Sequence, residues 1–154
     1  MEFIKSAVLS ISEKRKILDL WNNEYPEKLN YKSLTDFENY LGTLTEQSHI
    51  LMSDNNKDIK GWYFDFIREN KRWFAIILDS KVHGLGFGTQ ILNIAKEKEL
   101  ELYGWVIDHN NDKKQNGEIY KSPLSFYIRN GFEVLMKKRL ELDLISAVQI
   151  YWKK

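Results

Sequence analysis

Helical spacing of apolar residues dominates the first third of the chain. Ser10-Ile11-Ser12-Glu13 has the spacing of a capping box, and Ser33-Leu34-Thr35-Asp36 resembles a second helix start. Apolar residues then recur three and four positions apart, which predicts two amphipathic helices, the first of them stopped near Pro26. Their buried faces would comprise Ile17, Leu20 and Trp21 in the first helix, and Leu34, Phe37, Leu41 and Leu44 in the second. A strand over residues 3–9 precedes both helices.

From His49 onward the pattern becomes that of strands. Apolar and aromatic runs cover residues 49–52, 60–68 and 73–78, and polar turns separate them at 54–58 and 69–71. Three consecutive strands joined by short turns predict an antiparallel meander.

The remainder of the chain alternates between helices and strands. A helix with a charged outer face is expected over 90–99, then an apolar strand over 103–108 and a polar loop over 109–117. Ser122-Pro123 opens a short helix, with the serine as cap and the proline at the first helical position, and Gly131 ends it. Strands over 132–142 and 146–152 close the chain. The pattern predicts one α/β domain over 1–154, a mixed sheet with helices.

The turn His83-Gly84-Leu85-Gly86-Phe87-Gly88-Thr89 is the most informative segment for function, because it joins an apolar strand to a helix. Three alternating glycines leave backbone N–H groups uncovered at the positive end of the helix, with no bulky side chain to prevent close approach. Such a turn is suited to an anion, usually a phosphate.

Two familiar phosphate-binding patterns do not fit this turn. A Walker loop needs lysine and then serine or threonine after the glycines, whereas this chain has Gly88-Thr89-Gln90. A dinucleotide fingerprint needs its third glycine at position 89 and further parallel βαβ units downstream, and neither is present.

Composition narrows the range of functions that the protein could have. The 154 residues include 23 basic and 22 acidic side chains, a balance that argues against a general nucleic-acid binder. No cysteine is present, which excludes disulfides and thiolate chemistry, and no two histidines have metal-ligand spacing. The sequence has neither a signal pattern nor an apolar run of membrane-spanning length, so a cytoplasmic protein that binds neither membrane nor nucleic acid is expected.

Two motifs together resemble the GNAT superfamily of acetyl-CoA-dependent N-acetyltransferases. His83 to Gly88 resembles its motif A, Arg/Gln-x-x-Gly-x-Gly/Ala, with His83 in place of arginine or glutamine. The segment Ser125-Phe126-Tyr127-Ile128-Arg129-Asn130-Gly131-Phe132 resembles motif B, Phe-Tyr-x-x-x-Gly-Phe. The two motifs lie about 40 residues apart with a strand, a helix and another strand between them, which makes the pair much more specific than either alone.

The resemblance implies a GNAT-like α/β (α+β) fold: a mixed, mostly antiparallel sheet of about seven strands, flanked by about four helices, with one splayed strand pair. It implies acetyl-CoA as co-substrate and no metal. Pantetheine would enter the gap between the two splayed strands and pair with backbone groups of the first of them. The diphosphate would lie on amides of the glycine turn. The implied cofactor-binding residues are Leu78, Asp79, Ser80, His83, Gly84, Leu85, Gly86, Phe87, Gly88 and Thr89.

The resemblance also assigns Tyr127 as general acid for the leaving thiolate. A carboxylate or an ordered water must accept the proton of the amine, and Asp65, Asp79, Asp108 and Glu118 are open alternatives on or beside the relevant strands. Family members often carry an asparagine seven residues before the motif B tyrosine. In this chain Tyr120 occupies that position, which puts that contact with the coenzyme in question.

Several alternatives stay open at this point. The implied activity is acetyl transfer to a primary amine of a small molecule or peptide, and its alternatives are a non-catalytic acyl-CoA-binding module and a partner-binding domain with an empty slot. The polar loop would be a lid on the acceptor side or a solvated insertion. The aromatic residues of the strand over 60–68 would line an acceptor pocket or pack in the core. The closing strands could pair across a homodimer.

Overall fold

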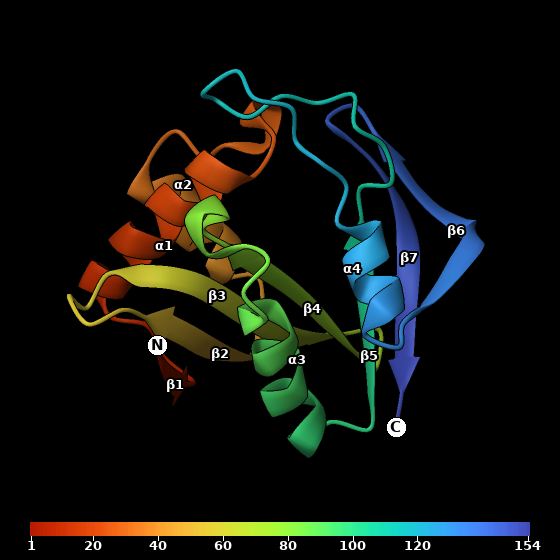
Figure 1. Ribbon diagram of the computed structural model, residues 1–154, viewed down its shortest axis with the longest axis horizontal. Helices are drawn as coiled ribbons and strands as arrows, with labels where there is room; N and C mark the ends of the chain where they lie inside the picture. Colours follow the sequence, from red (N-terminus) through yellow and green to blue (C-terminus); the bar gives the residue numbers. More distant parts are fainter.

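A seven-stranded sheet runs through the computed structural model, which describes all 154 residues (Figure 1). The strands are β1 (Glu2–Ser6), β2 (Thr45–Ser53), β3 (Ile59–Arg68), β4 (Lys71–Leu78), β5 (Glu101–Val106), β6 (Glu133–Leu142) and β7 (Ile145–Lys153). Their order across the sheet is β1-β2-β3-β4-β5-β7-β6, and only the β4–β5 pair is parallel. The predicted mixed, mostly antiparallel sheet and its β2–β3–β4 meander are confirmed.

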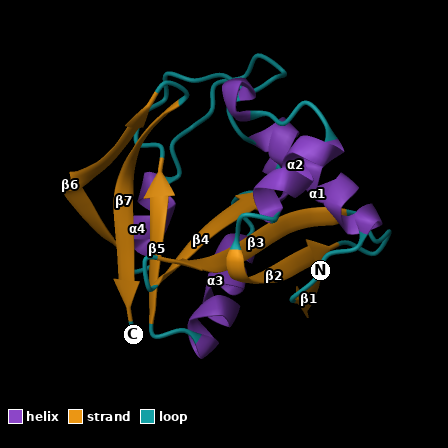
Figure 2. Ribbon diagram, turned by 180° about the vertical axis from the view of Figure 1, so that it is seen from behind, coloured by secondary structure: helices purple, strands orange, loops and turns teal.

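Helices cover both faces of this sheet (Figures 1 and 2). The α-helices are α1 (Ile11–Glu24), α2 (Leu34–Leu41), α3 (Phe87–Lys98) and α4 (Leu124–Arg129), and the short 3₁₀ turns are η1 (Glu27–Leu29) and η2 (Ser80–Val82). Helices α1 and α2 pack on one face, and α3 and α4 pack on the other. No helix is both long and apolar enough to cross a bilayer.

The helix ends follow local sequence signals, with one exception. Ser10 and Glu13 form the predicted capping box, and Ser33 caps α2. The prediction for α4 was wrong by one residue: Pro123 is the N-cap and the helix begins at Leu124. The Ser122 hydroxyl still accepts from Leu124 N–H (3.3 Å), and it donates to the Ile107 carbonyl (2.6 Å), so it also fastens the end of the polar loop to the chain that leaves β5.

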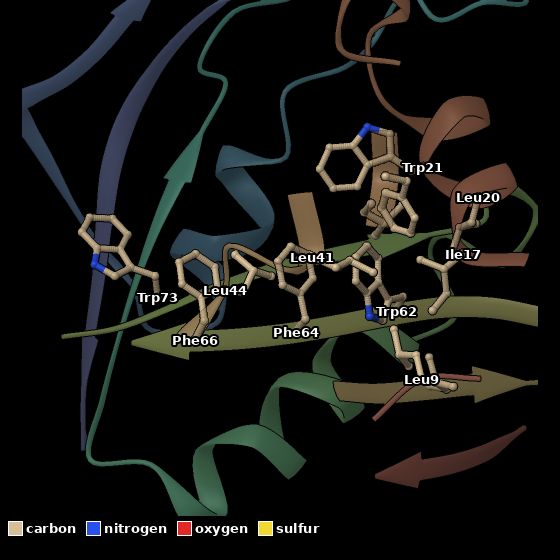
Figure 3. Packing of buried hydrophobic residues seen from close by; sticks show 13 residues of the cluster. Leu9, Ile17, Leu20, Trp21, Leu41, Leu44, Trp62, Phe64, Phe66 and Trp73 are labelled. Carbon is tan, nitrogen blue, oxygen red and sulfur yellow. The ribbon is translucent and has the colours of Figure 1, made fainter. Parts of the chain in front are cut away.

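Alternation along the central strands divides the core into two layers. Trp62, Phe64 and Phe66 of β3 point toward α1 and α2, where Figure 3 shows them in a row with Trp73 at the end nearest β5 and β7. Tyr63 points to the other face, toward α3 and α4. The aromatic side chains of β3 are therefore almost wholly buried, and of the two sequence alternatives the core role is the one observed.

The parallel pair β4–β5 is held by one rung only. Trp73 is paired with Tyr103, and beyond that rung the two strands diverge. From this point β5 continues its ladder with β7 as far as the Val106–Val148 pair, while β4 continues with β3 as far as Leu78–Gly61. The sheet is therefore split between the carboxyl-terminal halves of β4 and β5, as the resemblance implied.

His49 is a buried imidazole with both ring nitrogens engaged. The Trp62 indole N–H donates to Nδ1 (3.0 Å), so the ring proton is on Nε2, which donates to the Gln47 side-chain oxygen (2.8 Å). Burial, opposed by the nearby Asp65 carboxylate, lowers the pKa of His49 from 6.5 to about 4. The folded protein therefore holds this residue neutral.

Acid should destabilise the fold through His49. Because its pKa is lower in the folded than in the unfolded chain, its contribution is fully present above pH 6.5 and is lost as the pH falls toward 4. The free energy of unfolding should decrease by about 2 kcal/mol between pH 7.5 and 5, at about 1.4 kcal/mol per pKa unit. Urea titrations at the two pH values measure this change. His49→Asn should remove that part of the pH dependence, and equal slopes in the two proteins would contradict the assignment.

Candidate active site

The glycine turn connects η2 to α3 and takes a backbone path that requires glycine at two positions. Gly84 and Gly86 have φ angles of 76° and 85°, in the left-handed region, and Gly86 is the N-cap of α3. No heavy atom lies within 4 Å of the position that a Cβ would take on either residue. The turn therefore presents bare backbone to its surroundings.

Six consecutive amides of this turn, from Gly84 to Thr89, have no hydrogen-bond partner within the protein. The preceding amide, His83 N–H, donates to the Ser80 carbonyl, and the following one, Gln90 N–H, donates to the Gly86 carbonyl. The first N–H groups of a helix lack intrahelical acceptors and carry its positive partial charge. Six uncompensated donors around the start of a twelve-residue helix form a strong site for an anion.

Gly88 brings motif A into contact with motif B. A Cβ at this position would lie 2.8 Å from the Phe126 ring of α4 and 3.2 Å from Leu78 Cδ1 at the end of β4. Only glycine permits this approach, because both neighbours are packed against the core on this face. The start of α3, helix α4 and the end of β4 therefore meet at one point beside the split in the sheet.

The side of β4 that faces the split offers unpaired backbone groups. Asp79 N–H donates to the Lys60 carbonyl of β3 (2.9 Å), and successive residues of a strand direct their backbone groups to opposite sides. The N–H and C=O groups of Ile76 and Leu78 therefore point toward β5. The Leu78 carbonyl accepts from His83 Nε2–H (3.0 Å), so the His83 side chain folds back onto the strand end.

Tyr127 lies on the α3 and α4 side of the split. Its ring packs edge-on against Phe74 of β4 (centroids 5.8 Å apart) and against Phe132 (5.6 Å), and the residue is 6% exposed. Its hydroxyl makes no hydrogen bond within the protein and is not among the fully occluded polar atoms, so it borders accessible space. Burial, reinforced by the nearby Tyr120 hydroxyl, raises the pKa of Tyr127 well above 10, which keeps the phenol protonated.

Three of the four candidate carboxylates are engaged by other groups. Asp65 is fully buried and accepts from Ser48, Tyr63 and Arg72.

Arg139 binds Asp108 through two hydrogen bonds (2.6 and 3.1 Å), which holds the pKa of that carboxyl below its usual range. Asp79 accepts from Lys81 N–H (2.9 Å) and lies 3.5 Å from Lys60 Nζ. The fourth, Glu118, is on the exposed part of the polar loop.

The polar loop lies along the end of α1 and η1 (Figure 1). Lys113 C=O accepts from Glu27 N–H (2.8 Å), and Asp112 forms an ion pair with Lys28 (2.8 Å). An isolated β-bridge between Lys113 and Ile119 shapes the loop itself. Its residues are mostly exposed, as composition predicted, but its backbone is fixed at several points.

Glu24 at the end of α1 connects this loop to η2, which leads into the glycine turn. One carboxylate oxygen pairs with Lys114 Nζ (3.0 Å), and the other accepts from Ser80 N–H (2.9 Å). Both side chains of the ion pair are 11% exposed.

A cleft of about 220 Å³ lies at this junction, with a wholly polar lining of Asn23, Glu24, Asp79, Ser80, Lys81, Lys114, Gln115 and Asn116. No local sequence signal pointed to Glu24, because its two partners, Ser80 and Lys114, come from separate segments.

The comparisons with known proteins bear on fold rather than sequence. No protein-family model and no curated protein matches the chain. Among solved structures, an aminoglycoside 6′-N-acetyltransferase complexed with coenzyme A is similar with a TM-score of 0.72 at 13% identity, covering 99% of this chain and 97% of the other. A spermidine N-acetyltransferase chimera from Vibrio cholerae and hSSAT gives 0.69 at 18% identity, with 99% and 96% covered.

A third structure is the GNAT superfamily phosphinothricin acetyltransferase from Sinorhizobium meliloti in complex with AcCoA. It gives a TM-score of 0.67 at 12% identity, covering 99% of this chain and 89% of the other. The chain therefore has the fold of the GNAT acetyltransferases over nearly its whole length. The resemblance drawn from motifs A and B is confirmed at the level of fold.

Removal of the Glu24 carboxylate should release the polar loop. Glu24→Ala leaves Lys114 without its partner in a shielded position and frees the Ser80 amide. Hydrogen exchange at the amides of Glu27 and Tyr120, which bond to or within the loop, should accelerate about tenfold or more. Glu2→Ala, which breaks the exposed Glu2–Lys57 pair, is the matched control and should leave these rates unchanged. Unchanged exchange in Glu24→Ala would show that Glu24 does not hold the loop.

Proposed function

We propose that residues 1–154 form one acyltransferase domain that moves an acetyl group from acetyl-CoA to a primary amine. The observation that carries the proposal is the row of six unpartnered amides directly beside the split between β4 and β5. An anion cradle next to an opening in a sheet fits a ligand with a diphosphate at one end and a slender amide-bearing arm at the other. The CoA-bound structures of similar fold support the same ligand class.

The residues present fit acetyl-CoA in three respects. The amides from Gly84 to Thr89 would hold the diphosphate, which needs several donors and close approach. The outward backbone groups of Ile76 and Leu78 would pair with the amides of the pantetheine arm. For this pairing His83 must release the Leu78 carbonyl, and any contact with the Ser80 amide requires Glu24 to move.

Acetyl-CoA supplies an acyl thioester, whose carbon–sulfur bond is exchanged for a carbon–nitrogen bond to the amine, with an amide and a thiol as products. Tyr127 would donate a proton at the sulfur, because its protonated hydroxyl borders accessible space. Since Asp65, Asp79 and Asp108 are engaged elsewhere and Glu118 is on the exposed part of the polar loop, an ordered water would accept the proton of the amine. Catalysis then depends mainly on positioning both reactants in one slot.

Coenzyme binding tests directly whether the amides from Gly84 to Thr89 bind the diphosphate. Acetyl-CoA should bind the purified protein in calorimetry, whereas S-acetylpantetheine, which lacks the diphosphate, should bind at least about a hundredfold more weakly. Hydrogen bonds to a charged acceptor contribute about 1.5–3 kcal/mol each, so the loss of even one or two accounts for this factor. Equal affinity for the two ligands would place the diphosphate outside the turn.

Turnover tests the role of Tyr127. With an amine that the protein acetylates, Tyr127→Phe should lower kcat by about 10²–10⁴-fold without changing the Kd of acetyl-CoA, because the ring is kept and only the proton donor is lost. Thiol release measured with a chromogenic disulfide gives kcat. Tyr40→Phe, on α2, is the matched control and should keep full activity. A Tyr127→Phe enzyme with normal kcat would remove Tyr127 from the mechanism.

The alternative is a module of the same fold that binds acyl-CoA without transfer. Both functions predict stabilisation by the coenzyme, so a thermal shift does not separate them. Thiol release across a panel of amines does, because only the enzyme couples thiol formation to an amine.

A further inference from the structure

The face of the sheet opposite α3 and α4 carries an aromatic surface beside the split. Helix α1 contacts β3 and β4, α2 contacts β3, and Figure 2 shows that neither helix extends over β5 and β7. There the Trp73 and Trp105 rings stack (centroids 5.5 Å, 17° between planes), and Trp73 also contacts Tyr103 (5.6 Å). Tyr103 and Trp105 are half-buried, so parts of both side chains remain accessible.

This aromatic surface already holds one ammonium group of the protein. Lys71 Nζ lies 4.8 Å from the centroid of the Tyr103 ring, a cation–π distance. On the same strand face the Glu101 carboxylate accepts from the Tyr151 hydroxyl (3.2 Å). Electron-rich rings and a carboxylate favour a cationic or donor-rich ligand on this surface rather than an anion.

Gln149 is the one polar side chain buried in this part of the face. It is the antiparallel partner of Trp105 across the β5–β7 ladder, so the two side chains stand next to each other on the same side of the sheet. The residue is 5% exposed, and its side-chain oxygen is buried without a hydrogen-bond partner. The side-chain nitrogen is not fully occluded, so one end of the amide borders accessible space. A 180° rotation about the terminal side-chain bond exchanges the two atoms, and the oxygen then faces that space.

A buried amide oxygen without a hydrogen bond destabilises the fold, so a fold retains one rarely. The position of this one is informative, because Trp105 lies just past the last β4–β5 rung, where the strands diverge. Trp105 and Gln149 therefore border the split on this face.

We propose that Gln149 selects the amine acceptor by accepting a hydrogen bond from a second donor on that molecule, beside the Trp73–Trp105 stack. The inference rests on the proposed function for the identity of the reaction and deepens it by naming the substrate class. The acceptor is a diamine or an amino alcohol whose amine and second N–H or O–H group are separated by a short carbon chain. A simple alkylamine leaves the Gln149 oxygen unpaired and is rejected, since a site built for a hydrogen bond discriminates strongly against an analogue that lacks it.

Three amines of nearly equal size test this proposal on the protein without coenzyme. They are n-butylamine, 3-aminopropan-1-ol and 1,3-diaminopropane, which place a methyl, a hydroxyl or an ammonium group at the same distance from the reacting amine. Calorimetry should show that the amino alcohol and the diamine bind at least tenfold more tightly than n-butylamine. Tighter binding of both the amino alcohol and the diamine indicates a hydrogen bond to Gln149. Tighter binding of the diamine alone indicates that the site at Gln149 selects for positive charge.

Gln149→Met removes both polar atoms at nearly constant volume. It should reduce the preference over n-butylamine to threefold or less and should leave the melting temperature equal or higher, because an unpaired buried amide is lost. Gln149→Glu should instead increase the preference for the diamine over the amino alcohol. Gln90→Met, on the exposed side of α3, is the matched control and should keep the wild-type preference.

A preference that is unchanged in both Gln149 variants would overturn the proposal. That result is distinct from failure of the proposed function. Wild-type protein that binds the diamine but never releases thiol from acetyl-CoA would refute acetyl transfer while the assignment of Gln149 still stands on the binding data.

Discussion

The divergence of β4 from β5 after the Trp73–Tyr103 rung is the constraint on which the rest of the structure depends. An interior strand normally satisfies its backbone groups on both sides, and here β4 loses its partner on one side halfway along. Phe74 helps to hold the strands in this arrangement, because it lies so close to Gly104 that a Cβ there would be 2.9 Å from the ring. The split creates the opening, and every proposed binding group is at its rim.

Side chains from elsewhere in the chain compensate for part of that loss. His83 donates to the Leu78 carbonyl, and Glu24 accepts from the Ser80 amide. Both contacts satisfy backbone groups at the strand end that β5 does not reach, and both can be exchanged for a ligand that offers the same donors and acceptors. The glycine turn is left uncompensated, with six free amides, which is why we propose it as the anion site.

The two sides of the split differ in the chemistry of the groups that border them. On the side of α3 and α4 the opening is bordered by bare backbone and by Tyr127. On the other side it is bordered by stacked indoles and the unpaired Gln149 amide. The loop is joined through Glu24 to Ser80 in η2, which leads into the glycine turn.

Local elements could be predicted from the sequence, because capping, apolar spacing and turn composition act over a few residues. The capping box at Ser10, the meander from β2 to β4 and the two motifs that indicated the fold are of this kind. Which of these residues meet depends on how the chain packs. Gly88 touches Phe126, Glu24 reaches Ser80, and Gln149 stands beside Trp105 because strands far apart in sequence become neighbours in the sheet. Hydrogen bonds and burial at such meetings depend on register and packing, which no local pattern encodes.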